Sequence, residues 1–141
     1  MSTEQHKSVL RDMVHAMNQG DLDRATRDLG RDFVYEGPGA EPVRGPEAYR
    51  KLLSMYRKAF PDMRFEIQHM VAEGNTVVTL LRITGTHKGA FQGIPATGRS
   101  VVNPVASVAT FEGGKIVAER EYFDAMGLLG QLGALPEEVA G

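Results

Sequence analysis

The residues best suited to chemistry lie at the end of the last strand-like segment, residues 115–124. A period of two places Arg120, Tyr122 and Asp124 on one face, together with Ile116. A carboxylate can take up and release a proton, while a guanidinium and a phenol can stabilise a developing oxyanion. We therefore name Asp124, Arg120 and Tyr122 as candidate catalytic residues.

The orientation of this segment depends on its opposite face, which carries Glu119 and Glu121. Burial of carboxylates without partners costs much free energy, so we expect this face to be the wetter one. The face of Asp124 should then point inward, toward an apolar cavity. A structural alternative stays open, in which Asp124 caps the following helix and Arg120 pairs with it.

His87 is the fourth candidate catalytic residue and lies at the end of an expected strand, residues 75–87. A neutral imidazole could donate or relay a proton, or could only hydrogen-bond the backbone of the Gly89–Gly98 loop. Other side chains could bind a substrate or simply pack in the core or at a strand edge. The candidate substrate-binding residues are Tyr35, Tyr56, Phe60, Arg82, Asn103 and Met126. The four histidines are too scattered to indicate a metal set, and we predict neither a metal nor a cofactor.

The composition is that of an ordinary globular protein, with 141 residues, a net charge of −2, 42% hydrophobic and 24% charged residues. We expect one domain over residues 1–141, with a core large enough to need no disulfide. The chain has no cysteine, which excludes disulfide scaffolds, thiol catalysis, zinc fingers and iron–sulfur clusters. Acidic and basic residues are mixed along the chain, so we expect no nucleic-acid partner.

No apolar run approaches the roughly 20 residues of a membrane helix, and the N-terminus lacks a basic region followed by an apolar one. We therefore expect a cytoplasmic protein with no membrane partner.

The first 60 residues predict helices. A capping box at Ser2 and a stop at Gly20 bound the first helix, Asp21 caps a second, and a third begins at Pro46. A short strand, residues 33–36, lies between the second and third helices.

From residue 64 the apolar period changes to two, which predicts four strands in hairpin succession. They span residues 64–73, 75–87, 100–112 and 115–123, and a short helix and a frayed acidic end follow over residues 125–141. In the first of these strands, alternation places Val71 on the same face as Phe65. Helices followed by strands favour an α+β architecture, a cone of helices on a strongly curved antiparallel or mixed sheet. The mouth of such a cone is a natural pocket for a small molecule.

Several motifs resemble the SnoaL-like polyketide (ester) cyclase family. The similar segments are residues 18–23, 59–62, 84–99, 114–116, 122–124 and 131–133. The resemblance covers nearly the whole chain and implies the nuclear transport factor 2-like cone, assembled through its sheet as a homo-oligomer, a dimer or tetramer. It also implies a cofactor-free aldol ring closure of a polyketide ester, with an aspartate near the end of the last strand as acid/base. Asp124 matches that position, whereas Arg120 stands where the cyclases often carry a tryptophan.

We therefore expect an enzyme that acts on a small, largely apolar carbonyl compound, with Asp124 as general acid/base. One alternative is another reaction on the same fold, such as isomerisation, dehydration or epoxide hydrolysis. Another is a non-catalytic ligand-binding or oligomerisation module, which predicts a satisfied Arg120–Asp124 pair and no cavity beside it.

Overall fold

The helices form where the sequence predicts them. They are α1 (Thr3–Gln19), α2 (Leu22–Thr26), α3 (Pro46–Ala59) and α4 (Ala125–Gln131). Ser2 and Gln5 form the capping box of α1, and Gly20 ends this helix in the left-handed conformation, with φ 72°. Asp21 caps α2 by accepting a hydrogen bond from a backbone amide of its first turn. The computed structural model describes residues 1–134, so the expected acidic end lies outside the described residues.

The strands form one mixed sheet in the order β2-β1-β6-β5-β4-β3. They are β1 (Leu29–Glu36), β2 (Val43–Arg44), β3 (Arg64–Glu73), β4 (Thr76–Thr86), β5 (Ser100–Glu112) and β6 (Lys115–Phe123). β1 and β6 pair in parallel and all other neighbours are antiparallel. β1 begins at Leu29, earlier than the predicted start at residue 33.

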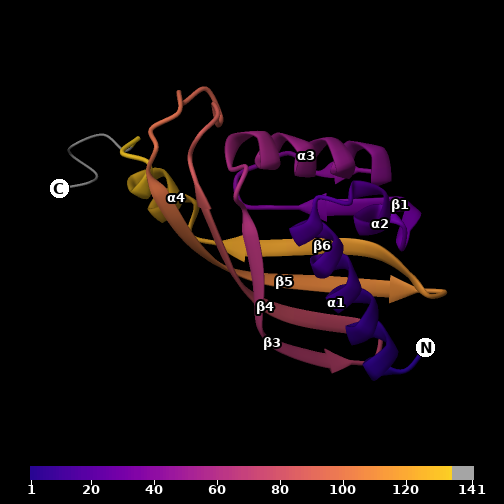
Figure 1. The fold of residues 1–141 in the computed structure, drawn as a ribbon. Helices are drawn as coiled ribbons and strands as arrows, with labels where there is room; N and C mark the ends of the chain where they lie inside the picture. The colour runs from indigo at the N-terminus through magenta and orange to yellow at the C-terminus, as the bar shows by residue number, and fades with distance from the viewer. Residues whose placement is uncertain (135–141) are drawn as a thin grey trace.

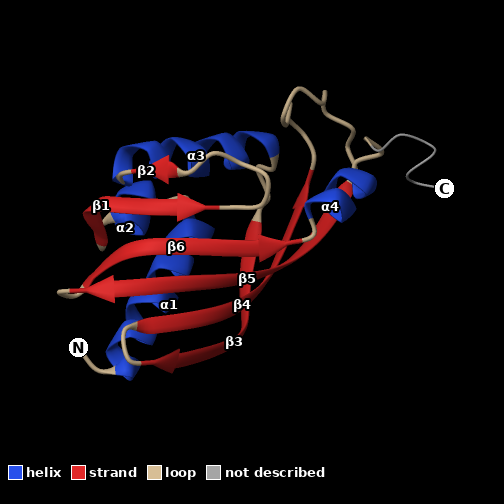
Figure 2. Ribbon diagram, turned by 180° about the vertical axis from the view of Figure 1, so that it is seen from behind, coloured by secondary structure: helices blue, strands red, loops and turns tan. Residues whose placement is uncertain are grey.

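Helices α1 and α3 lie on one face of the sheet, with α1 across β3 to β5 and α3 over β1, whereas α4 packs beside β5 at the end of the sheet (Figure 1). Seen from behind, the helices of residues 1–134 leave most of the other face of the sheet uncovered (Figure 2). The predicted α+β architecture is confirmed. None of the helices within residues 1–134 has the length and apolar character needed to cross a membrane.

The main core lies between α1, α3 and the inner face of the sheet. Leu10 and Met13 of α1 pack there with Phe33, Phe111 and Ile116 from the strands. Burial of large apolar side chains of this kind is the main stabilising contribution to the fold. A second cluster surrounds Leu132, and its other buried members are Ala59, Phe60, Phe91 and Val101.

Two β-bulges change which side chains face the core. In β3 the register against β4 shifts between Ile67 and His69, so the strict alternation of the sequence does not hold. Val71 is consequently 53% exposed, and the prediction that it shares the face of Phe65 is wrong. In β6 the register against β5 shifts beside Val117, after the buried Ile116.

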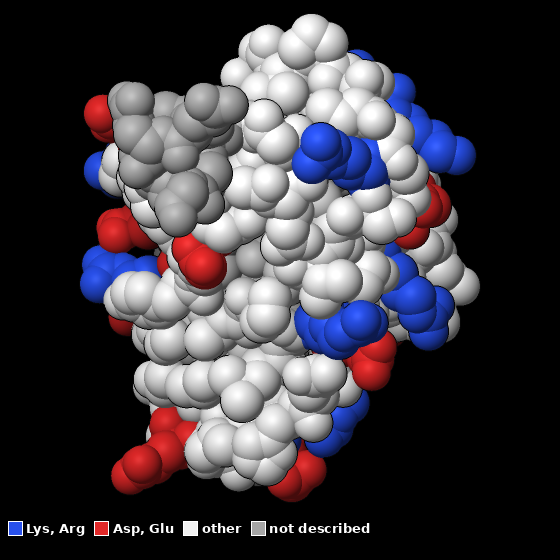
Figure 3. Space-filling view, turned by 90° about the vertical axis from the view of Figure 1, so that its left-hand side faces the viewer, with Lys and Arg blue, Asp and Glu red and all other residues white. Residues whose placement is uncertain are grey.

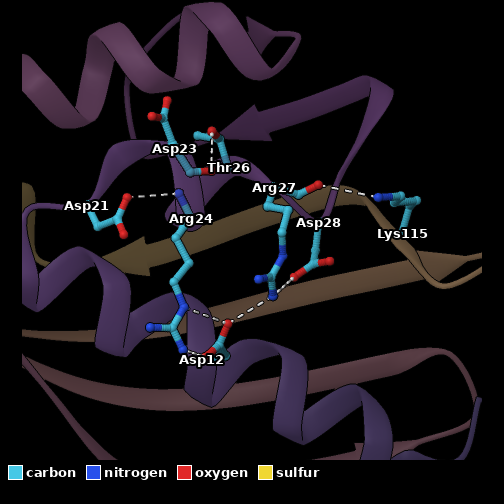
Figure 4. A network of polar contacts seen from close by, with 8 residues as sticks. All are labelled: Asp12, Asp21, Asp23, Arg24, Thr26, Arg27, Asp28 and Lys115. Carbon is cyan, nitrogen blue, oxygen red and sulfur yellow. Dashed lines mark hydrogen bonds and ion pairs between the residues drawn. The ribbon is translucent and has the colours of Figure 1, made fainter.

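An ion-pair network joins α1 to the segment that leads into β1 (Figure 4). Asp12 of α1 accepts hydrogen bonds from Arg24 and from Arg27, whose Nη2 lies 3.0 Å from the carboxylate. The same Arg27 nitrogen lies 3.1 Å from Asp28, and the Lys115 ammonium donates to the Arg27 carbonyl oxygen at 3.3 Å. These contacts fix α2 against α1 at the corner where β1 enters the sheet.

Candidate active site

A largely apolar cavity of about 100 Å³ lies between the helices and the inner face of the sheet. Met13 and Met17 of α1, Leu53 of α3, Phe65 of β3 and Leu128 of α4 contribute to its walls. The exterior at the α4 end shows acidic and basic side chains scattered over a mostly uncharged surface, outside the residues drawn in grey (Figure 3). A partly open apolar cavity of this kind suits a small ligand that carries few charges.

Polar side chains enter the cavity from four neighbouring strands. Thr79 of β4 pairs with Ser107 of β5, and Ser107 pairs with Glu121 of β6. Tyr35 of β1 pairs with Glu119 of β6. All five side chains line the cavity, so the sheet presents one polar band inside an otherwise apolar space.

Glu119 is the more deeply buried of the two carboxyl groups, with 7% of its surface exposed. The Ser107 hydroxyl donates to its Oε1 atom at 3.3 Å, and the buried Tyr49 hydroxyl of α3 also donates to it. Burial, and then the neighbouring negative charge of Glu121, raise the pKa of Glu119 to about 8. Glu119 is therefore mostly protonated at neutral pH.

Glu121 lies two residues further along the same face of β6 and is partly buried. Burial raises its pKa, and a hydrogen bond from the Tyr35 hydroxyl opposes this by favouring the charged form. Burial likewise raises the pKa of the Tyr35 and Tyr49 hydroxyls, so both phenols keep their protons and act as donors. The cavity thus combines the more basic carboxyl group of Glu121, the neutral carboxylic acid of Glu119 and phenol donors. Groups of these types can carry out general acid/base catalysis.

Comparison with known proteins identifies the family to which this chain belongs. The family model described as SnoaL-like polyketide cyclase matches residues 7–132. The chain belongs to this family. Its relatives include the aklanonic acid methyl ester cyclase DnrD of Streptomyces peucetius, which is 30% identical over 130 residues, 89% of this chain and 88% of that protein. Membership of the SnoaL-like family supports an enzymatic role and confirms the resemblance seen in the sequence.

Solved structures confirm the SnoaL-like fold. AclR, a proposed hydroxylase from Streptomyces galilaeus, superposes with a TM-score of 0.85 and is 30% identical, with 96% of this chain and 100% of that chain covered. An epoxide hydrolase from M. tuberculosis superposes with a TM-score of 0.75, covering 92% of this chain and 90% of that one. At 23% identity, the second likeness is one of fold alone.

Four of the residues named from the sequence as substrate-binding candidates do line the cavity of this SnoaL-like chain. They are Tyr35, Tyr56, Phe60 and Asn103. Tyr56 and Phe60 lie on and just after α3 and form aromatic contacts with Phe91, at ring-centroid distances of 5.6 and 5.4 Å. Their contact with a substrate stays a prediction.

The predicted inward orientation of Arg120, Tyr122 and Asp124 is wrong. The bulge beside Val117 reverses the alternation, so Glu119 and Glu121 face the cavity in their place. Arg120 pairs with Glu36 at 2.8 Å, and the Arg120–Asp124 pair that the structural and non-catalytic alternatives predict is absent from the described residues.

Tyr122 is 54% exposed and belongs to the uncovered face of the sheet. The exposed Asp124 caps α4, accepting a hydrogen bond from the Gly127 amide at 2.8 Å. At the other end of α4, the Gln131 side chain bonds the Val102 amide and carbonyl, at 2.7 and 2.9 Å. The cap that Asp124 forms at Gly127 supports the structural alternative for this residue, and its catalytic role stays a prediction.

His87, Arg82 and Met126 lie away from the cavity. His87 is fully buried, and its Nδ1 atom accepts a hydrogen bond from the Thr97 amide at 3.2 Å. This contact holds the loop after β4, and it supports the structural alternative for His87. Arg82 is exposed on the outer face of β4, and Met126 is 55% exposed on α4.

Sequence reasoning missed Glu119, Glu121 and Tyr49 as cavity residues, and Ser107 and Thr79 with them. One signal for the glutamates was present in the sequence, because strict alternation places the large apolar Phe123 on their face. No comparable signal distinguishes Ser107 or Thr79 from other small polar residues in the strands.

Proposed function

We propose that this chain is a polyketide ester cyclase that closes a carbocyclic ring by an intramolecular aldol reaction, with Glu121 as the general acid/base. The position of Glu121 supports this most, because it is a carboxylate that faces an apolar cavity beside the Tyr35 hydroxyl. The relatives named as methyl ester cyclases support the reaction class.

In the proposed reaction, Glu121 removes a proton from the carbon next to a substrate carbonyl, and an enolate forms. The enolate carbon attacks a ketone carbon of the same molecule, which creates the new carbon–carbon bond and an alkoxide. Glu121 then returns its proton to the alkoxide, so the product is an isomer of the substrate. The apolar surroundings assist the first step, because a carboxylate with a raised pKa is a stronger base.

A matched pair of variants tests this assignment. Glu121→Gln keeps the size and polarity of the side chain but cannot take up a proton, so we expect a loss of about 100-fold to 10,000-fold in kcat. Asp124→Asn keeps a helix-capping side chain, because asparagine is as good an N-cap as aspartate, and we expect nearly full activity. The assay incubates purified protein with aklanonic acid methyl ester and follows a product of equal mass by chromatography and mass spectrometry.

The reverse result would restore the prediction made from the sequence resemblance. If Asp124→Asn abolishes turnover while Glu121→Gln stays active, Asp124 is the acid/base and the assignment to Glu121 fails. Wild-type protein that converts no methyl ester of this class refutes the cyclase function itself.

We further propose that the protein is a homo-oligomer that assembles through the uncovered face of the sheet. Leu80, Ala106 and Tyr122 form a direct cross-strand row there, and Leu80 and Tyr122 are 43% and 54% exposed. Exposed large apolar side chains in adjacent strands favour burial against a second copy. Tyr122→Lys should yield monomers in analytical ultracentrifugation, whereas a mutant with the wild-type mass distribution would refute this interface.

A cytoplasmic location stays a prediction.

A further inference from the structure

Glu119 and Glu121 stand together in the cavity, and no ion pair joins either of them to a cationic side chain within the described residues. Within residues 1–134, the other titratable side chains that line the cavity are Tyr35 of β1 and Tyr49, Tyr56 and Arg57 of α3. The Arg57 guanidinium donates to the carbonyl oxygens of Met17 and Asn18, at 3.0 and 3.3 Å, at the end of α1. Two ionised carboxylates here would repel each other in an apolar space, so the site favours one negative charge shared unequally between two groups.

The surroundings of the two carboxyl groups decide which of them keeps the proton. Glu119 is the more buried, and it lies between the Ser107 hydroxyl and the Tyr49 hydroxyl, both neutral donors. Glu121 is closer to the end of β6 and less enclosed. Desolvation therefore disfavours the charged form more strongly at Glu119, and burial raises its pKa to about 8.

The geometry points to Glu119 as a second catalytic residue, a neutral carboxylic acid that donates a hydrogen bond to the substrate oxygen while Glu121 acts as the base. This inference rests on the proposed cyclase function and extends it. The hydroxyls of Ser107 and Tyr49 occupy acceptor positions of the Glu119 carboxyl, which leaves its own O–H as the donor available to the cavity.

The donor stabilises negative charge that develops on the substrate. When Glu121 removes the proton, electrons move from the breaking carbon–hydrogen bond toward the carbonyl oxygen. A hydrogen bond from neutral Glu119 to this oxygen strengthens as the charge grows, and Glu119 keeps its proton throughout. Ionisation of Glu119 above its pKa removes the donor and adds repulsion, so activity should fall at alkaline pH.

Glutamine in place of Glu119 tests this role, because its amide donates a hydrogen bond but cannot ionise. We expect Glu119→Gln to keep kcat within about tenfold and to lose the alkaline fall in kcat near pH 8. Glu119→Leu removes the donor and should lower kcat by about 100-fold to 1,000-fold, the usual cost of one such donor. Glu66→Gln on the exposed side of β3 is the matched control and should leave the pH profile unchanged.

A second measurement is independent of any substrate. Infrared spectra of the wild-type protein at neutral pH should contain the carboxylic acid band of a protonated side chain that disappears as the pH rises through about 8. Glu119→Gln should lack this band and Glu66→Gln should retain it. If Glu119→Gln has the wild-type band, Glu119 is ionised and the inference is overturned.

Failure of this inference is distinguishable from failure of the proposed function. If Glu119→Gln is as inactive as Glu121→Gln on a substrate that the wild type cyclises, the donor role of Glu119 is wrong while the cyclase function stands. If the wild type cyclises no methyl ester, the proposed function fails, and the infrared titration alone then decides whether Glu119 is held protonated.

Discussion

Burial of Glu119 should make the protein lose stability as the pH rises, and Glu119→Gln should remove this loss. In the unfolded chain this carboxyl ionises near its ordinary pKa of 4.5, whereas the folded protein keeps it protonated up to about pH 8. Between these pH values the folded state binds more protons than the unfolded state, so the free energy of unfolding falls as the pH rises.

The magnitude follows from the size of the pKa shift. Each pKa unit corresponds to about 1.4 kcal/mol, so a shift from 4.5 to about 8 sets an upper limit of about 5 kcal/mol. The wild type should therefore lose several kcal/mol, up to this limit, across the pH range between the two pKa values. The loss occurs mostly between about pH 5 and pH 8 and levels off above the folded pKa.

Urea unfolding at a series of pH values measures this directly. Because the chain contains no tryptophan, far-UV circular dichroism is the suitable signal. The free energy of unfolding of the wild type should fall more steeply with pH than that of Glu119→Gln, while the exposed control Glu66→Gln should follow the wild type. Parallel curves for the wild type and Glu119→Gln would refute the reasoning, because they would show that Glu119 ionises normally in the fold.

Three further changes test the packing of the fold and the ion-pair network at Asp12. Gly89→Ala places a Cβ atom in steric clash with the backbone carbonyl oxygen of Lys58 and should cost about 1–3 kcal/mol of stability. Gly30→Ala places its Cβ atom 3.4 Å from the nearest neighbour and should cost less, and chemical denaturation compares the two variants. Leu132→Ala empties part of the second core cluster and should cost about 2–5 kcal/mol by the same assay; a smaller loss would show that α4 contributes little to the core. Asp12→Asn should lower the melting temperature slightly at low salt and not at about 1 M salt, and a loss that persists at high salt would contradict an electrostatic origin.

Local sequence signals predicted the helices correctly because their causes are local. The capping box at Ser2, the cap at Asp21 and the proline at Pro46 each act within one turn of a helix, so no distant contact is needed. The change from a helical period to a period of two likewise located β3 to β6 within a residue or two.

The faces of the strands were harder to predict because alternation holds only while the ladder is regular. One extra residue near His69 turned Val71 outward, and one at Val117 turned Glu119 and Glu121 inward. A bulge depends on how two strands pair across the sheet, so neither strand by itself shows it.

The sequence by itself determined the family, the α+β order of elements and several walls of the cavity, among them Tyr35 and Tyr56. Only the tertiary structure decided which carboxyl groups enter the cavity. The cost of burying a glutamate argued against Glu119 and Glu121, but that cost depends on partners supplied by other elements. Ser107 from β5 and Tyr49 from α3 supply hydrogen bonds to Glu119, and protonation removes its charge. Tyr49 lies on a helix much earlier in the chain and Ser107 on the neighbouring strand β5, so only the fold brings both to Glu119.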